Sequence, residues 1–182
     1  MEKGFILWMT GLSGAGKTTL SRELAKHLIE SGVACEILDG DEVRENLSKG
    51  LGFSREARDI NVRRIGYVAN LLSRNGVGVI VAAISPYRET RNELKTQTHN
   101  FIEVYIKCPI EECISRDVKG LYQKAIDGVI PQFTGISDPY EEPLLPEVVV
   151  DTSKETLNVC VSRVLHYLEQ EQLMPIFTKR TE

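Results

Sequence analysis

Residues 11–18 read Gly-Leu-Ser-Gly-Ala-Gly-Lys-Thr and match the pattern G-x-x-x-x-G-K-[ST]. Glycines in such a loop let successive backbone N–H groups point at phosphate oxygens, and the positive end of the following helix adds to the attraction. The plainer interpretation is a glycine-rich turn that only connects a strand to a helix. The lysine, the threonine and both flanking elements argue against it. The pattern therefore predicts a site for the phosphates of a nucleoside triphosphate.

Two side chains at the end of this loop would contact the charged groups of the nucleotide. Lys17 is expected to reach the β- and γ-phosphates, and the Thr18 hydroxyl to ligate Mg²⁺, the hard cation that nucleotide sites normally use. The residues expected to bind ATP here are Gly11, Leu12, Ser13, Gly14, Ala15, Gly16, Lys17, Thr18 and Thr19.

A pair of carboxylates ends the next apolar run, which closes with Asp39-Gly40-Asp41. In open α/β sheets, ligands bind at the edge where such a run ends. One carboxylate could orient hydrated Mg²⁺ there, and the other could accept the proton of an acceptor hydroxyl. The plainer interpretation is an Asp-Gly turn in which Asp41 caps a helix over Glu42–Leu47. Both interpretations can hold together.

Basic and amide side chains recur farther on at a spacing of three residues, as Arg55, Arg58 and Asn61. This spacing places them on one face of a helix that begins at Ser54, and we expect that face to lie opposite the apolar stripe. Such a face is usually only solvated. Because Phe53 supplies an aromatic surface just before it, a pocket for an anion and a base is the alternative that we retain.

A phosphate-binding loop does not settle what is done with the nucleotide. A regulatory GTPase should carry the guanine-reading motif N-K-x-D, which the sequence lacks. The run Asp117–Gly120 matches the D-x-x-G switch pattern, but it lies far downstream after a polar helical segment, and we interpret the match as coincidence. A mechanical or transport ATPase usually has an acidic residue where an apolar strand ends, and Val77–Ile84 ends in Ser85-Pro86 instead. A kinase for a small molecule remains.

The elements that must position these residues alternate along the chain. Short and almost wholly apolar runs predict strands covered on both faces. These runs are Phe5–Met9, Val33–Leu38, Val77–Ile84, Phe101–Ile106 and Val148–Val150. Helical spacing of apolar residues predicts one helix that stops at Ser31-Gly32 and others over Ser54–Arg74 and Glu155–Glu169.

Strand and helix alternate about five times, which is typical of an α/β protein with right-handed crossovers. We expect the three-layer fold of P-loop NTPases, with a mostly parallel five-stranded sheet and helices on both faces. Residues 117–146 break the alternation with four prolines, three glycines and no clear period. The aromatic residues of this segment favour a functional lid over a disordered insertion. The chain, residues 1–182, is expected to form one domain with this lid.

Composition excludes several classes of function. The 182 residues are 42% hydrophobic and 26% charged, with a net charge of −4 and a pI near 5.5. This balance argues against nucleic acid or an anionic membrane as a partner, so an anionic ligand must be held locally. No apolar stretch is long enough to span a bilayer and no leader pattern opens the sequence, so we expect a cytoplasmic protein.

The cysteines are too scattered for a disulfide framework or a zinc site, and we expect buried thiols. They are Cys35, Cys108, Cys113 and Cys160.

Further motifs follow the phosphate-binding loop in order. They are Asp39–Arg44, Gly52-Phe53-Ser54 with Arg58 and Asn61–Ile65, Ile84–Arg88, Lys119–Tyr122, Phe133–Ile136 and Asp138–Glu141. Together with the loop, this series resembles the adenylyl-sulfate kinase (APS kinase) family, and the resemblance extends to about Pro146. An ordered series is far more specific than the loop alone. Val118 departs from the family pattern, which usually has proline at that position.

The resemblance implies transfer of the γ-phosphoryl group of ATP to the 3′-hydroxyl of adenosine 5′-phosphosulfate (APS). The products would be ADP and 3′-phosphoadenosine 5′-phosphosulfate (PAPS), in sulfate assimilation. The resemblance also implies that Phe53 and Phe133 sandwich the acceptor adenine and that Arg116 packs on the adenine of ATP. The other acceptor-site residues would be Asp41, Arg44, Arg58, Asn61, Ile84, Ser85 and Lys119. Guanidinium forks suit tetrahedral oxyanions, and aromatic rings suit a neutral base. Members of the family commonly form homodimers.

We expect direct in-line transfer, with Asp41 near the acceptor hydroxyl, Lys17 and Mg²⁺ neutralising charge, and Asp39 holding the cation through water. Ser85 matches a serine often described in the family as a phosphoserine intermediate, but the sequence places no obvious base beside it. The rival interpretations are a P-loop kinase for a nucleoside, gluconate or shikimate, and a nucleotide-sensing switch. An inactive regulatory domain is disfavoured because Lys17 and Asp41 are both present.

Overall fold

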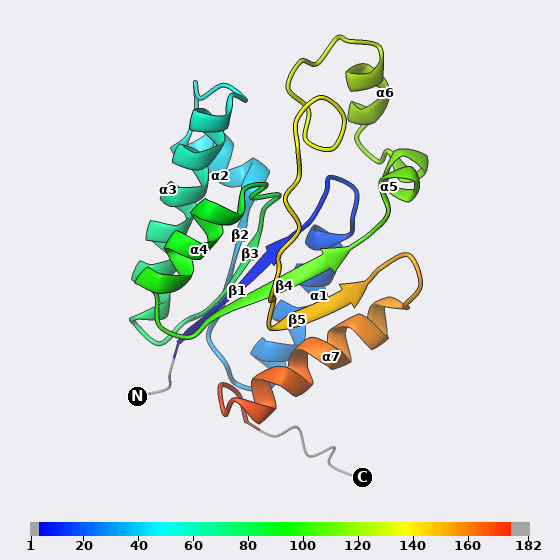
Figure 1. The fold of residues 1–182 in the computed structure, drawn as a ribbon. Helices are drawn as coiled ribbons and strands as arrows, with labels where there is room; N and C mark the ends of the chain where they lie inside the picture. The colour runs from blue at the N-terminus through cyan, green and yellow to red at the C-terminus, as the bar shows by residue number, and fades with distance from the viewer. Residues whose placement is uncertain (1–3, 176–182) are drawn as a thin grey trace.

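The computed structural model describes residues 4–175 and builds them around one five-stranded sheet (Figure 1). The strands are β1 (Phe5–Thr10), β2 (Cys35–Asp39), β3 (Gly78–Ala82), β4 (Phe101–Lys107) and β5 (Val148–Asp151). They lie in the order β2-β3-β1-β4-β5, and every pairing is parallel. The expected α/β fold is confirmed.

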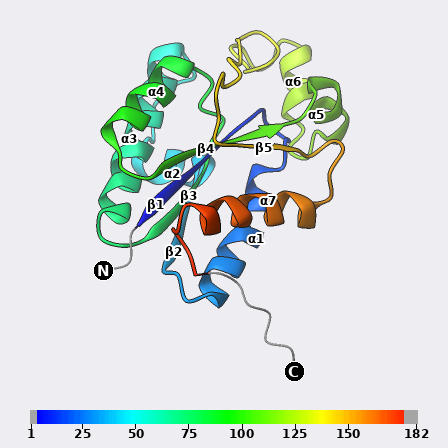
Figure 2. The same ribbon diagram turned by 60° about the horizontal axis from the view of Figure 1, so that its bottom comes forward.

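Helices cover both faces of the sheet and its carboxyl edge (Figures 1 and 2). They are α1 (Lys17–Glu30), α2 (Gly40–Leu47), α3 (Arg55–Ser73), α4 (Arg88–Gln97), α5 (Ile110–Arg116), α6 (Leu121–Ile126) and α7 (Leu157–Gln170). Helices α1 and α7 lie on one face and α3 and α4 on the other, whereas α5 and α6 lie beyond the ends to which the strands point. None of the helices in residues 4–175 is both long enough and apolar enough to cross a membrane.

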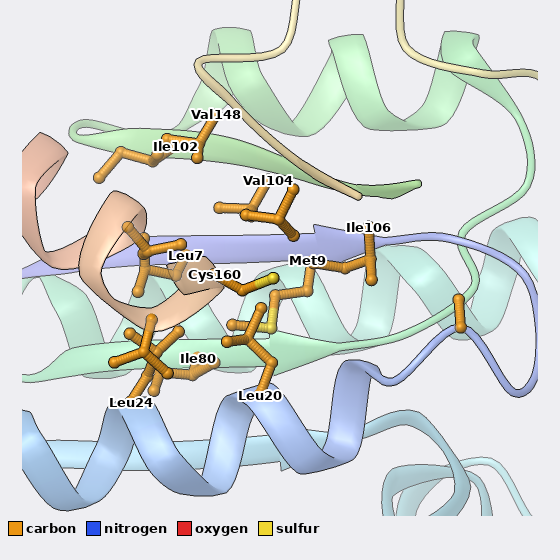
Figure 3. Packing of buried hydrophobic residues seen from close by; sticks show 14 of the residues in the cluster. Leu7, Met9, Leu20, Leu24, Ile80, Ile102, Val104, Ile106, Val148 and Cys160 are labelled. Carbon is orange, nitrogen blue, oxygen red and sulfur yellow. The ribbon is translucent and has the colours of Figure 1, made fainter. Parts of the chain in front are cut away.

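The sheet is buried on both sides because its strand residues alternate between two apolar clusters. In β1, Phe5, Leu7 and Met9 join the cluster on the side of α1 and α7, whereas Ile6 and Trp8 join the cluster on the side of α3. Figure 3 shows the first cluster, in which side chains of the central strands meet those of α1 and α7. This packing fixes the end of β1, from which the phosphate-binding loop starts.

The strands predicted from apolar runs are all present, and their boundaries differ by at most two residues. Helix α3 begins where expected, with the Ser54 hydroxyl accepting a hydrogen bond from the Ala57 amide as its N-cap. Helices α4 and α6 had no clear periodic signal, because α4 buries only Leu94 among apolar residues and α6 is short. Both were therefore missed.

The D-x-x-G match at residues 117–120 has a structural explanation. The Asp117 carboxylate accepts hydrogen bonds from the amides of Leu121, Tyr122 and Gln123 at the start of α6. These bonds, led by that from Tyr122, lower the pKa of Asp117 below its ordinary value. Gly120 adopts a left-handed conformation with φ 62°, as the N-cap position before α6. The interpretation of the match as coincidental agrees with this capping role.

Candidate active site

A cavity of about 420 Å³ opens at the carboxyl edge of β1, β2 and β3. It is enclosed by the phosphate-binding loop, the starts of α2 and α3, the loop after β3, and the segment 117–146. Its lining contains these sequence-predicted residues: Ser13, Gly14, Gly16, Lys17, Thr18, Thr19, Asp39, Asp41, Arg44, Phe53, Arg58, Asn61, Ile84, Ser85, Arg116, Lys119 and Phe133. Residues from distant parts of the sequence thus share one enclosed space.

The phosphate-binding loop turns back on itself through glycines in left-handed conformations. Gly14 has φ 74° and Gly16 has φ 99°, values that other residues rarely adopt. Neither the Leu12 nor the Ala15 side chain lines the cavity. Ala15 is buried in the core, and Leu12 packs toward the opposite side of the loop. Gly11 also lies off the cavity lining, so only backbone groups at these three positions are candidates for contact with phosphate.

The Lys17 ammonium group is held inside its own loop. Its Nζ donates hydrogen bonds to the carbonyl oxygens of Gly11 (2.9 Å) and Leu12 (2.7 Å). Burial lowers the pKa of Lys17 from its ordinary value to about 8, an effect that the nearby charges of Asp41 and Asp39 offset only in part. A polyphosphate placed against this ammonium group would favour its charged form.

The lowered pKa of Lys17 predicts a pH dependence of ATP binding. Below pH 8 the ammonium is charged both with and without nucleotide, so this group makes no contribution to the pH dependence. Above pH 8 it must take up a proton on binding, and the Kd for ATP should rise by up to about tenfold per pH unit until the pKa of the complex is reached. Calorimetric titration at pH 7 and pH 9, in buffers of different protonation enthalpy, measures this uptake. Equal proton uptake by wild type and Lys17→Met at pH 9 would contradict the assignment.

Asp39 connects the phosphate-binding loop to α2. Its Oδ2 accepts a hydrogen bond from the Thr18 hydroxyl (2.9 Å), and its Oδ1 accepts one from the Asp41 amide (3.0 Å). Asp39 is therefore the N-cap of α2, and the plainer interpretation, in which Asp41 caps this helix, is wrong. The reason is that α2 begins at Gly40, so the extended residue before it takes the cap position. The Asp41 side chain is left to face the cavity.

Across the cavity, Asp41 forms an ion pair with Lys119 of the segment 117–146. Both side chains are more than half exposed, so the pair adds little to stability and either partner can be exchanged for a charged ligand. The pair shows that the 117–146 segment reaches over the cavity to the start of α2.

A group of two arginines and one aromatic ring forms part of the cavity wall. The guanidinium of Arg44 lies 4.6 Å from the centre of the Phe53 ring, and that of Arg58 lies 5.6 Å from it. Arg44 donates to the carbonyl oxygens of Leu51 and Gly52, and Arg58 Nε donates to that of Phe53. These contacts hold the ring at the cavity wall while 51% of the residue stays exposed. We call Arg44, Phe53 and Arg58 the arginine–aromatic group.

The expected helical face of Arg55, Arg58 and Asn61 is divided in the structure. Arg58 and Asn61 are only 8% and 6% exposed, on the same side of α3 as its apolar stripe, so the expectation that they lie opposite the stripe is wrong. They are buried because they lie on the inward face of α3, where Arg58 donates to the Gln132 carbonyl and pairs with Asp138 of the 117–146 segment at 3.8 Å. Arg55 stays outside, 4.5 Å from the ring centre of Tyr87.

The electrostatics of this wall favour an anion. Burial, with a further contribution from Arg58, lowers the pKa of Arg44 below its ordinary value. Two guanidinium groups close together without a full set of carboxylate partners would gain from a tetrahedral oxyanion between them. In residues 4–175, the buried amide oxygen of Asn61 has no hydrogen-bond partner. A buried amide without a partner at a cavity wall is a ready site for a polar ligand atom.

The Ser85 hydroxyl points into the protein. It accepts a hydrogen bond from the Trp8 indole at 2.9 Å and donates one to the Ala83 carbonyl at 3.3 Å. The residue is 3% exposed and adopts φ 40°. Among the described residues, no carboxylate or imidazole is hydrogen-bonded to this hydroxyl. Beside it, the carbonyl oxygen of Ile84 accepts from the Thr10 hydroxyl at 2.7 Å.

Two further predicted nucleotide contacts, Phe133 and Arg116, line the same cavity. Phe133 is largely buried and meets the Tyr122 ring edge-on, with 5.0 Å between centres. Arg116 donates to the Thr152 carbonyl at 2.9 Å and pairs with Glu112.

Two residues at this cavity were given no role from the sequence. The Tyr122 hydroxyl donates to the Ser13 carbonyl at 2.9 Å, which ties the 117–146 segment to the phosphate-binding loop. Thr134 lines the cavity with a buried hydroxyl that has no partner in the described part of the chain. No sequence pattern distinguishes such contacts, because they join segments far apart along the chain.

The four cysteines are free thiols. Cys108, Cys113 and Cys160 are buried as expected, whereas Cys35 is only partly so. Burial raises the pKa of Cys35 and of Cys113 to about 12, so both remain protonated at neutral pH.

The fold and the site together define a P-loop kinase. Its features are a phosphate-binding loop after β1, a parallel sheet in the order 2-3-1-4-5, and a second set of binding side chains in the same cavity. Residues 3–151 match the family model described as adenylylsulphate kinase. An adenylyl-sulfate kinase of Chloroflexus aurantiacus is 59% identical over 93% of this chain and 91% of its own length. One of Rippkaea orientalis is 56% identical over 93% of both chains. The APS kinase CysC of Mycobacterium tuberculosis, solved in complex with AMPPNP and APS, has a TM-score of 0.89 at 37% identity and covers 93% of this chain and 99% of its own. The chain belongs to the adenylyl-sulfate kinase family.

Proposed function

We infer that the protein transfers the γ-phosphoryl group of ATP to the 3′-hydroxyl of APS, forming PAPS and ADP in sulfate assimilation. The observation that carries this inference is that the arginine–aromatic group and Lys17 of the phosphate-binding loop line a single cavity. An aromatic ring offers a stacking surface for the adenine of APS, and the two guanidinium groups suit its sulfate and phosphate oxygens. ATP phosphates at the loop would then meet the acceptor from the opposite side.

We assign the two nucleotides to two sets of residues. The loop residues and Arg116 would hold ATP. The acceptor would lie between Phe53 and Phe133, with Arg44, Arg58, Asn61 and Lys119 on its polar groups and the backbone of Ile84 beside it. The buried and unpartnered Asn61 amide oxygen supports this assignment. The segment 117–146 would act as the lid, since it carries Lys119 and Phe133 to the cavity.

We propose Mg²⁺ as the cation that accompanies ATP. The hydrogen bond between the Thr18 hydroxyl and the Asp39 carboxylate brings together two oxygen ligands of the kind Mg²⁺ prefers, at the mouth of the phosphate-binding loop. Thr18 would bind the cation, and Asp39 would orient it through water. When bound, Mg²⁺ neutralises charge on the phosphates.

Transfer of the phosphoryl group needs positioning and charge neutralisation more than covalent help. Lys17 would exchange its two carbonyl partners for phosphate oxygens and keep its charge against them. Asp41, released from Lys119 as the acceptor enters, would take the proton of the 3′-hydroxyl. The covering segment would keep water from competing with that hydroxyl. Ser85 would contribute through the shape of its loop and not as a phosphate carrier.

The function is tested by measuring ADP release from ATP with a panel of acceptors. We expect rapid release with APS and only slow background release with a nucleoside, gluconate or shikimate. Turnover that responds to one of the other alcohols would support a different P-loop kinase. Slow hydrolysis that is independent of every acceptor would support a nucleotide-sensing switch.

Replacing Phe53 by Ala is expected to raise the KM for APS by about tenfold to a hundredfold, because stacking on a base contributes roughly 1–3 kcal/mol. The KM for ATP should stay near its wild-type value. The ring is half exposed, so its loss should cost little stability. Tyr67→Ala, at a residue of α3 that is 67% exposed, is the matched control and should leave both KM values unchanged. Steady-state kinetics with each substrate varied in turn measures the two KM values. An equal change in both would show that Phe53 has no role specific to APS binding.

Replacing Ser85 by Ala is expected to leave substantial turnover, within about tenfold of wild type, because the hydroxyl is occupied by Trp8 and Ala83. The fluorescence of Trp8, the single tryptophan, should change as its indole N–H loses a partner. Initial rates at saturating ATP and APS provide the measurement. Loss of essentially all activity from a folded variant would reject direct transfer.

We further propose a cytoplasmic homodimer. Four free thiols suit a reducing compartment, where ATP is also supplied. The homodimer is proposed from the resemblance of the motifs to the family. Light scattering during size exclusion should give about twice the 20.4 kDa of one chain, and a monomer mass at micromolar concentration would contradict it.

A further inference from the structure

Arg91, on α4, is buried behind the loop that follows β3, with 1% of its side chain exposed. Its guanidinium uses three nitrogens on three different parts of the chain. Nε donates to Glu103 Oε1 of β4 at 2.7 Å, Nη1 donates to the Ser85 carbonyl at 2.6 Å, and Nη2 donates to the Glu141 carbonyl at 2.7 Å. One side chain therefore joins the sheet, the loop after β3 and the end of the 117–146 segment.

The Ser85 carbonyl is a meaningful partner because the backbone there is strained. Ser85 has φ 40°, a conformation that costs free energy for any residue with a side chain and persists only when its surroundings hold it. Arg91 on the carbonyl and Trp8 on the hydroxyl hold it from two sides. The strained turn sets the direction of Ile84 and Ser85, which line the cavity.

The contact at Glu141 fixes the far end of the 117–146 segment to the same loop. The Glu141 amide donates to the Pro86 carbonyl at 2.8 Å, and its carboxylate accepts from the Arg88 amide at 2.9 Å. Next to it, the Tyr140 hydroxyl is 2.9 Å from Thr10 Oγ1, which itself donates to the Ile84 carbonyl. The segment that brings Lys119 and Phe133 over the cavity thus also contacts the loop after β3, which lines the same cavity.

We propose that Arg91 is a positioning residue for the acceptor. By binding both carbonyls at once, it holds the loop after β3 and the 117–146 segment at a fixed separation, and this separation sets the width of the acceptor half of the cavity. The proposal rests on the proposed function, which assigns that half to APS. An ion pair with Glu103 alone would use only one nitrogen of the Arg91 guanidinium group. A buried ion pair is by itself weak evidence that a residue stabilises the fold. The two carbonyl contacts require the planar fork that arginine provides.

The variant Arg91→Lys separates positioning from stability. Lysine keeps the positive charge for Glu103, but its single ammonium cannot span three acceptors that arginine reaches with separate nitrogens. We expect the KM for APS to rise by at least about tenfold, while the KM for ATP stays within about threefold. A residue that only supports folding would lower the folded fraction and hence the apparent kcat, but would not change one KM selectively.

The matched control is Glu103→Gln, which removes the charge of the pair but leaves the two carbonyl contacts of Arg91 in place. It should lower the melting temperature while the KM for APS stays within about threefold of wild type. A second variant, Tyr140→Phe, removes only the hydroxyl through which the 117–146 segment contacts Thr10 and, through it, the Ile84 carbonyl. It should raise the KM for APS by about threefold or more. This variant decides the proposal if Arg91→Lys does not fold.

The proposal is overturned if the folded Arg91→Lys protein, or Tyr140→Phe in its place, keeps the wild-type KM for APS. It is also overturned if Glu103→Gln raises that KM as much as Arg91→Lys does, because the ion pair and not the carbonyl contacts would then matter. Wild-type protein measured in the same assay shows whether the proposed function has failed or only the role proposed for Arg91. Absence of APS-dependent turnover in wild type would overturn the proposed function and this proposal together, whereas a failure confined to the variants would overturn only the role of Arg91.

Discussion

Replacing Asp41 by Asn is expected to lower kcat by about 10²–10⁴-fold, the usual range for loss of a residue that takes a proton in the transition state. The Asp41 side chain faces the cavity and pairs with Lys119, whereas the cap of α2 is provided by Asp39. The substitution therefore removes a proton acceptor without removing the cap. The KM for ATP should change little, because the phosphate-binding loop is untouched.

The matched control for Asp41→Asn is Glu42→Gln, a neighbouring exposed carboxylate in the first turn of α2. It carries the same change of charge and should keep wild-type kcat. Steady-state rates at saturating ATP and APS, with circular dichroism to verify folding, give the comparison. If both variants lose activity equally, the effect comes from the charge of the helix end, and Asp41 is not the proton acceptor.

Replacing Lys17 by Met is expected to lower kcat/KM for ATP by about 10²–10³-fold, as loss of a preorganised charged donor to a reacting anion does. The fold should survive the change. Burial already lowers the pKa of Lys17 to about 8, which means that the surroundings disfavour its charged form and that removal of the charge relieves this cost. The melting temperature at pH 7 should therefore remain close to that of wild type.

Lys26→Met is the corresponding control, because Lys26 lies on the same helix with its side chain mostly exposed and only a weak contact to Glu23 at 4.0 Å. Its activity should equal that of wild type. ADP release measured over a range of ATP concentrations distinguishes the two variants. A Lys17→Met protein with unimpaired kcat/KM for ATP would show that the ammonium does not act on the phosphates.

The local features of this molecule follow from short stretches of sequence. The phosphate-binding loop is encoded in eight consecutive residues, and the buried strands are encoded in runs of apolar residues whose boundaries differ by no more than two positions. These features depend on neighbours along the chain, and that is why composition and spacing are sufficient to predict them. The order of motifs along the chain also predicted the family.

Most of the features that the sequence did not predict depend on contacts between distant segments. Arg58 and Asn61 were expected on the helix face opposite the apolar stripe, but both are buried, and Arg58 contacts Gln132 and Asp138. In the plainer interpretation Asp41 capped α2, but the helix begins two residues earlier than that interpretation placed it, and Asp39 takes the cap position. The three contacts of Arg91 have no local signal at all, since its partners lie 6, 12 and 50 residues away.

The proposed reaction depends on direct transfer between two adenine nucleotides that share one cavity. A single-turnover experiment with γ-³²P-labelled ATP, excess protein and APS tests it most directly. Label should pass from ATP to the 3′-phosphate of PAPS, with no labelled protein at any time before product forms. Label that accumulates on the protein before it reaches PAPS, or that is released as inorganic phosphate at a rate independent of APS, would contradict the account.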